Sequence, residues 1–202
     1  MRLGMVIDLS RCVGCQACTV ACKQKNGTPP GIFWGRVLVS ETGKYPNAKP
    51  TFTPILCMHC EKPPCESACP TGATAKQADG TVTVDQEKCI GCRYCMVACP
   101  YNARGFNYTA LKPYYVGQKL TPFEERHAAE HEAGKVGKCN FCADRVAGKD
   151  APKCVETCPA KARFFGDLDD PQSEVARLIA KRGGYQLRAE LGTRPSVYYL
   201  PA

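Results

Sequence analysis

The hydrophobic pattern of the chain predicts short helices and strands. Within residues 173–182, the apolar side chains of Val175, Leu178 and Ile179 recur at a spacing that places them on one face of a helix. The pair Gly183-Gly184 would end this helix. We expect its apolar face to pack against the core of the protein or against another subunit.

Two more elements follow from local signals. Asp79-Gly80 lies between the strand-like runs 73–77 and 81–84, which predicts a β-hairpin. A helix is predicted over residues 122–133, inside a segment, 106–137, that contains no cysteine. No run approaches the roughly 18 apolar residues of a membrane-spanning helix, so no direct membrane span is expected. The first eight residues show no apolar segment with a cleavage site, so we expect no secretion signal.

The composition indicates that cysteine has a structural or chemical role, because 16 of the 202 residues are cysteine. A share of about 8% is close to the level at which cysteine forms the framework of a protein. Without export, these cysteines would meet a reducing compartment, where metal ligation or redox chemistry is favoured over disulfides. The formal charge is +8, from 27 basic and 19 acidic residues, and this excess need not indicate nucleic acid. No nucleic-acid partner is expected.

The cysteines form four groups of four with none left over. The first and third groups share the spacing C-x2-C-x2-C-x3-C and lie a constant 77 residues apart (89 minus 12), so they are an internal repeat. The second and fourth groups are looser but complete. In chain order the groups are Cys12, Cys15, Cys18, Cys22; Cys57, Cys60, Cys65, Cys69; Cys89, Cys92, Cys95, Cys99; and Cys139, Cys142, Cys154, Cys158.

The repeated spacing is that of bacterial ferredoxins, in which three cysteines hold one iron-sulfur cube and the fourth reaches a neighbouring cube. Clusters are therefore expected in pairs. Only 19 residues (70–88) separate groups two and three, against 34 (23–56) and 39 (100–138) for the other linkers. This favours a compact inner unit built from groups two and three, with groups one and four closing an outer unit. Spacing alone leaves open the adjacent pairing of one with two and three with four.

On these motifs the chain resembles the four-cluster, ferredoxin-like electron-transfer subunit of dimethyl sulfoxide reductase family molybdopterin oxidoreductases. The subunits of polysulfide, thiosulfate and tetrathionate reductases look most similar. The resemblance covers nearly the whole chain. The segments that carry it are Ile7–Cys12, Cys57–Cys65, Cys99–Arg104, Lys138–Arg145, Cys154–Pro159 and Phe165–Asp167.

The resemblance implies an α+β fold of two ferredoxin-like units, each holding two 4Fe-4S clusters, with short strands, short helices and long loops. The outer unit would comprise 1–48 and 106–202, with 106–137 inserted, and the inner unit 49–105. Some relatives lack the second cysteine of group three and hold a three-iron centre, but Cys92 is present here. The implied ligands are Cys12, Cys15, Cys18, Cys158 for cluster one; Cys22, Cys139, Cys142, Cys154 for cluster two; Cys57, Cys60, Cys65, Cys99 for cluster three; and Cys69, Cys89, Cys92, Cys95 for cluster four.

The implied function is electron relay without catalysis. Electrons would pass between a molybdopterin (Mo or W) catalytic subunit and an integral membrane quinone-reactive subunit or another redox partner. The alternative is a polyferredoxin subunit of a hydrogenase or formate dehydrogenase complex. A structural zinc protein is disfavoured, because each C-x2-C-x2-C run supplies three ligands within seven residues. We expect a membrane-associated location through the partners, at the periplasmic face by co-export with the catalytic subunit, and a cytoplasmic location is the alternative.

Several other residues invite a functional interpretation. His127 and His131 spell the H-x-x-E-H zinc-protease signature, but their charged surroundings favour a solvated helix face. His59, inside group two, would either tune a cluster or serve as a packing residue. Four basic residues close to cysteines could raise cluster potentials or be ordinary surface charges: Lys62, Lys88, Arg93 and Lys138.

Overall fold

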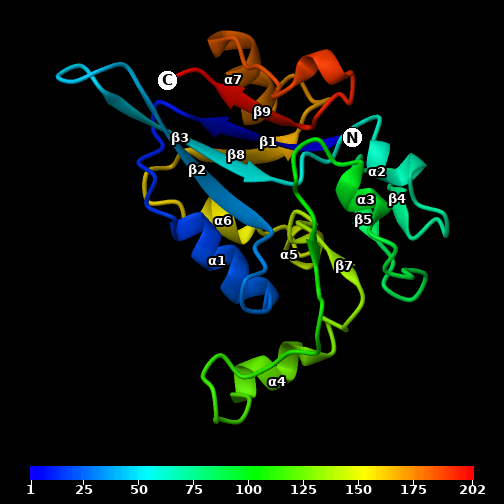
Figure 1. The fold of residues 1–202 in the computed structure, drawn as a ribbon. Helices are drawn as coiled ribbons and strands as arrows, with labels where there is room; N and C mark the ends of the chain where they lie inside the picture. The colour runs from blue at the N-terminus through cyan, green and yellow to red at the C-terminus, as the bar shows by residue number, and fades with distance from the viewer.

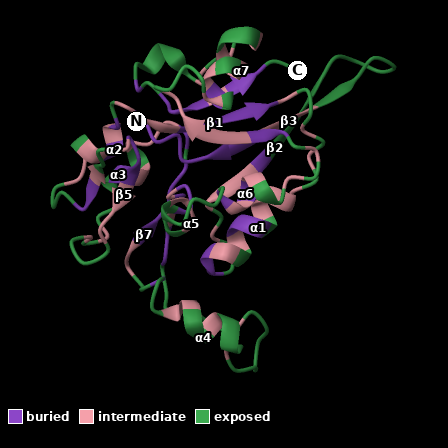
Figure 2. Ribbon diagram, turned by 180° about the vertical axis from the view of Figure 1, so that it is seen from behind, coloured by how far each residue is buried: buried purple, intermediate pink, exposed green.

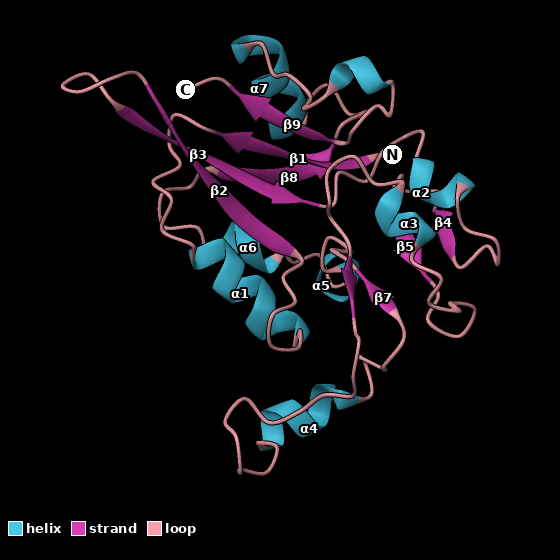
Figure 3. Ribbon diagram, viewed as in Figure 1, coloured by secondary structure: helices cyan, strands magenta, loops and turns pink.

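The computed structural model describes residues 1–202 as four small sheets surrounded by short helices (Figures 1 and 3). This mixture confirms the α+β expectation. The strands are β1 (Leu3–Asp8), β2 (Gly35–Thr42), β3 (Lys49–Leu56), β4 (Thr74–Lys76), β5 (Val82–Val84), β6 (Gly105–Phe106), β7 (Val136–Gly137), β8 (Arg163–Asp167) and β9 (Val197–Leu200). The helices are α1 (Ala17–Asn26), α2 (Pro64–Ser67), α3 (Tyr94–Val97), α4 (Pro122–Ala128), α5 (Ala143–Ala147), α6 (Lys153–Glu156) and α7 (Glu174–Arg182), with a 3-10 turn at Ala189–Leu191. None of the helices has the length and apolar character that crossing a bilayer requires.

The largest sheet joins the two ends of the chain. Its order is β8-β1-β9, with β1 antiparallel to β8 and parallel to β9. Met5, Val6 and Ile7 of β1 are all fully buried, and side chains alternate between the two faces of a strand. Met5 and Ile7 belong to a core that contains cysteines, whereas Val6 packs with Val175 and Leu200. The sheet therefore separates a cysteine-containing core from an ordinary apolar one.

Helix α7 confirms the amphipathic helix predicted near the C-terminus and covers one face of this sheet (Figure 1). The Ser173 hydroxyl accepts a hydrogen bond from the amide of Ala176, which caps the helix, and Gly183 ends it in the left-handed conformation with φ 63°. Val175 is fully buried against the sheet. The apolar face of the helix thus packs against the core of its own chain.

Two hairpins extend from the body of the protein. Strands β4 and β5 pair with Lys76 opposite Val82, which confirms the hairpin predicted at Asp79-Gly80. Strands β2 and β3 form a longer hairpin whose far end projects from the molecule and is exposed (Figures 1 and 2). The predicted boundary between residues 48 and 49 falls within this hairpin, just before β3, and the boundary between 105 and 106 falls inside β6. Both boundaries stay predictions.

The inserted segment leaves the body as an arm that carries α4 (Figure 1). Thr121 and Glu124 form a capping box at the start of this helix. The helix ends at Ala128, so the predicted extent of 122–133 is wrong at its C-terminal end. The reason is tertiary: His131 is buried and bonds the Asn26 carbonyl, and the following backbone bonds Asn107, which draws the chain back towards β7.

Candidate cluster sites

Three cavities are each lined by four cysteines. Each cavity takes three cysteines from one group in the sequence and one from another. We name these cysteines by cavity: the first set is Cys12, Cys15, Cys18 and Cys158, the third set is Cys57, Cys60, Cys65 and Cys99, and the fourth set is Cys69, Cys89, Cys92 and Cys95.

The remaining four cysteines, Cys22, Cys139, Cys142 and Cys154, are all buried, and we name them the second set. Burial raises the pKa of Cys22 to about 12, and the neighbouring thiols of Cys154 and Cys142 contribute to this rise. Burial also raises the pKa of Cys139 well above its ordinary value, with Cys22 and Cys154 contributing. The sixteen cysteines are thus grouped in space as the resemblance implied, and ligation of a cluster by each set stays a prediction.

The loops around the first and fourth sets repeat the same backbone geometry. Gly14 and Gln16 have φ of 68° and 61°, and their counterparts 77 residues later, Gly91 and Arg93, have φ of 71° and 64°. Residues of opposite handedness in succession curl a loop so that its amides face inwards, a geometry that favours anions. The sequence repeat is therefore also a repeat of backbone conformation.

A substitution at Gly91 tests this loop geometry. An added Cβ would collide with the backbone carbonyl of Gly134, in addition to the cost of about 1–2 kcal/mol for a side chain in the left-handed region. We expect Gly91→Ala to lose up to about four irons per chain, those of the fourth set, in an iron and sulfide determination. Gly72→Ala is the matched control, because Gly72 has φ of 66° near the same cavity but open space around its Cα. Equal iron content in the two variants would contradict this account.

The residues present fit a negatively charged, polynuclear cluster. Cysteine thiolates favour iron-sulfur clusters, zinc or copper(I). The side chains of the first, third and fourth sets each surround a hollow, and no three His, Cys, Asp or Glu side chains converge closely enough for a single metal ion. Arg104 lines the cavity of the third set, and its buried Nη2 has no hydrogen-bond partner. Such an orphaned donor is costly unless an acceptor occupies the cavity.

Two buried arginines beside the cysteines were missed by the sequence reasoning. Arg163 donates from Nη2 to the Sγ of Cys18 at 3.2 Å, and Arg104 donates from Nη1 to the Oγ1 of Thr74 at 3.2 Å. The neighbouring thiols raise the pKa of both guanidinium groups. A sequence signal was present, because Cys-Pro-x-x-Ala-Arg occurs at both 99–104 and 158–163.

The four basic residues singled out from the sequence divide into two kinds. Lys138 is buried, and its Nζ donates to the carbonyl of Cys139 at 2.9 Å and to that of Val82. The other three are exposed: Lys62, Lys88 and Arg93. Ordinary surface charge therefore describes Lys62 and Lys88. Arg93 also lines the cavity of the fourth set and lies over the ring of Phe106 at 5.2 Å, and only Lys138 of the four is buried.

His59 packs closely against its neighbours, but its buried Nε2 has no hydrogen-bond partner, and its role in packing or in tuning a cluster stays a prediction. It is fully buried, its Nδ1 accepts a hydrogen bond from the amide of Val82 at 2.9 Å, and its ring stacks on Phe141 with centroids 3.8 Å apart. Burial, with Lys138 and Arg104 nearby, holds the pKa of His59 well below its ordinary value. The imidazole is therefore neutral at physiological pH.

The H-x-x-E-H motif does not form a metal site. The Nδ1 of His127 bonds Glu130 at 3.0 Å, whereas the Nε2 of His131 bonds the Asn26 carbonyl at 2.6 Å. The two imidazoles thus make separate contacts. The expected solvated face is wrong for His131, which is buried beside Trp34.

Comparison with known proteins agrees with this geometry. Residues 48–113 and 115–168 match a family model described as a 4Fe-4S dicluster domain, and residues 11–73 match a second model of the same description. Two such domains and sixteen cysteines are consistent with four 4Fe-4S clusters.

Relatives match along almost the entire chain. The B subunit of selenate reductase from Mesobacillus selenatarsenatis is 46% identical over 97% of this chain and 70% of its own length. The arsenate respiratory reductase iron-sulfur subunit of a Shewanella species is 39% identical over 99% of this chain and 96% of its own length. The B subunit of tetrathionate reductase from Salmonella typhimurium is 39% identical over 98% of this chain and 72% of its own length. The chain therefore belongs to the 4Fe-4S dicluster family of iron-sulfur electron-transfer subunits of reductase complexes, as its resemblance implied.

Proposed function

We propose that this chain relays electrons through four 4Fe-4S clusters, one held by each cysteine set, within a molybdopterin (Mo or W) oxidoreductase. The gathering of all sixteen cysteines into four sets carries the proposal. When bound, the clusters supply one-electron redox chemistry. The reductase names of the relatives support a catalytic partner subunit that binds the substrate.

The two ferredoxin-like units belong to this proposal. The outer unit, 1–48 and 106–202, would hold the first and second sets, and the inner unit, 49–105, the third and fourth. The sheet of β1, β8 and β9 supports the outer unit, because it ties the N-terminal segment to the C-terminal third of the chain. The hairpin of β4 and β5 lies within the inner unit.

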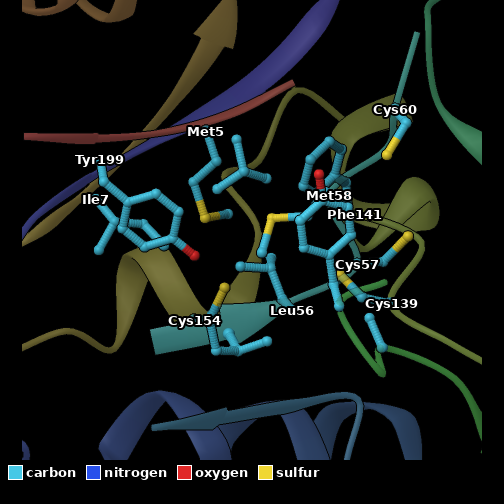
Figure 4. Packing of buried hydrophobic residues seen from close by; sticks show 14 residues of the cluster. Met5, Ile7, Leu56, Cys57, Met58, Cys60, Cys139, Phe141, Cys154 and Tyr199 are labelled. Atoms are coloured by element: carbon cyan, nitrogen blue, oxygen red, sulfur yellow. The ribbon is translucent and has the colours of Figure 1, made fainter. Parts of the chain in front are cut away.

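The contacts between sets indicate the order of the relay. Arg163 lines the cavity of the first set and has Cys154 of the second among its neighbours. Cys139 of the second set and Cys57 of the third lie in one hydrophobic cluster, among Leu56 and Phe141 (Figure 4). Cys65 of the third set and Cys95 of the fourth share another hydrophobic cluster. The order is therefore first, second, third, fourth.

The ends of this order are the places where cysteines reach the surface. Among the sixteen cysteines only Cys15, in the first set, and Cys92, in the fourth, are exposed. Val13 lies beside the former with 62% of its surface exposed, and Ile90 beside the latter with 67%. We place the two partners at these ends, the catalytic subunit against one of them and an integral membrane quinone-reactive subunit against the other.

The proposed location follows from these partners. The chain would be attached to the membrane through them, at the periplasmic face, after export together with the catalytic subunit. Protease treatment of intact spheroplasts should then degrade the subunit. Protection until the cells are lysed would instead place it in the cytoplasm.

Anaerobic purification of the intact complex from its native host tests the function. We expect about sixteen irons and sixteen sulfides per chain, because four clusters of four irons and four sulfides are present. One molybdenum or tungsten should accompany them. The same iron content with nickel, or with no second metal, would overturn the oxidoreductase assignment in favour of a hydrogenase-type or free polyferredoxin role.

A further inference from the structure

Only three of the 27 lysine and arginine residues are buried: Arg104, Lys138 and Arg163, with exposed fractions of 6%, 4% and 6%. None of the three forms a salt bridge with a carboxylate, although ten other cationic groups in the chain do. Burial of an unpaired cation is costly, so each requires another source of negative charge. Cysteine sulfurs and the clusters they hold are the anions available there.

Arg163 lies between the first and second sets. Its guanidinium lines the cavity of the first set and donates to the Sγ of Cys18 at 3.2 Å. Among the groups that raise its pKa are Cys154 of the second set and Cys158 of the first. A single fixed charge therefore faces two neighbouring sets.

Arg104 occupies the corresponding place between the third and fourth sets. It lines the cavity of the third set, and its Nη1 donates to the Oγ1 of Thr74, a residue that lines the cavity of the fourth. Cys65 of the third set and Cys95 of the fourth raise its pKa. Both arginines end a Cys-Pro-x-x-Ala-Arg segment, so the same sequence motif places a buried arginine beside both pairs of sets.

Lys138 lies between the second and third sets. It directly precedes Cys139 of the second set, and its Nζ donates to the carbonyl of Cys139 at 2.9 Å. The same ammonium donates to the carbonyl of Val82, which lines the cavity of the third set. Lys88 also directly precedes a cysteine that begins a group, but its side chain is 65% exposed. Burial, and not position in the motif, distinguishes Lys138.

We propose that Arg163, Lys138 and Arg104 are charge-compensating residues, one at each of the three junctions of the relay, and that each sets the reduction potentials of the two clusters beside it. The inference rests on the proposed function. Transfer of one electron oxidises one cluster and reduces its neighbour, so the added negative charge moves across the junction. A fixed cation between the two stabilises the reduced form on either side, and it does so strongly because the surroundings are buried and weakly screened.

The test is a redox titration of the loaded complex, followed by electron paramagnetic resonance. Arg163→Gln should lower the equilibrium constant for reducing clusters one and two by about tenfold, which is about 59 mV for one electron. Clusters three and four should keep their potentials. Arg104→Gln should lower the reduction potentials of clusters three and four and leave those of clusters one and two unchanged. Lys138→Gln should shift clusters two and three.

Lys88→Gln and Lys62→Gln are the controls, because each removes the charge of an exposed side chain that lies within two residues of a cysteine, Cys89 of the fourth set or Cys60 of the third. They should leave all potentials nearly unchanged. Arg163→Lys and Arg104→Lys keep the positive charge, so they should retain wild-type reduction potentials. If a glutamine variant loads fewer irons, the potentials of these lysine variants test the role of the charge instead. Equal shifts at all four clusters, shifts in the controls as large as in the buried variants, or lysine variants that behave like glutamine would overturn the inference. A wild-type complex lacking four titrating clusters would instead overturn the proposed function.

Discussion

Replacing Cys158 by serine should remove the cluster of the first set and leave the other three in place. Cys158 lines one cavity with Cys12, Cys15 and Cys18, although Cys154, only four residues earlier, belongs to the second set. A serine hydroxyl is a poor substitute for a thiolate at an iron-sulfur site. We expect the iron content to fall by about four irons per chain. The electron paramagnetic resonance signals of one cluster should disappear.

Cys154→Ser is the matched variant, and it should remove the cluster of the second set instead. The two substitutions lie one turn apart on or beside α6, so general damage to that helix would affect both clusters in both variants. Loss of the second cluster alone in Cys158→Ser would contradict the crossed arrangement. It would favour ligation of one cluster by the four cysteines of the last group alone, Cys139, Cys142, Cys154 and Cys158.

Removal of iron should unfold most of the chain. The main hydrophobic cluster of 14 buried residues includes Cys57, Cys60, Cys139 and Cys154, so the sulfurs that hold the clusters are part of the core itself. Without clusters, the three buried cations would also lose their anionic partners. Structural metal sites contribute on the order of 10 kcal/mol to folding, more than the net stability of many small domains.

Hydrogen exchange measured before and after anaerobic chelation checks this prediction. Amide protection should be lost first across 57–69 and 89–99, where the four-residue helices α2 and α3 are the only regular elements. Protection should persist longest in β1, β9 and α7, because Val6, Val175 and Leu200 form a small core without cysteine. Unchanged protection around Cys60 and Cys95 after complete removal of iron would show that the polypeptide holds its own fold. Reloading with iron and sulfide should restore the original pattern and serves as the control.

Local sequence determined several features of this protein. The period of apolar residues and the capping signals around α7 act within a few residues, so the helix over 173–182 was predictable. The Asp79-Gly80 hairpin is equally local, because a turn type depends on the residues in it. Cysteine spacing fixed the number of groups and the kind of cofactor, since ligand chemistry depends on residue type and on separation along the chain.

Tertiary structure decided the features that depend on residues far apart in the sequence. Spacing left open how the groups combine, and only folding brings Cys158 beside Cys12. The early end of α4 depends on the contact of His131 with Asn26, 105 residues away. Lys88 and Lys138 stand at the same place in their motifs, yet one is exposed and the other buried. Burial is set by the surrounding chain, and it determines whether a positive charge is screened by water or acts on the cysteine sets with weaker screening.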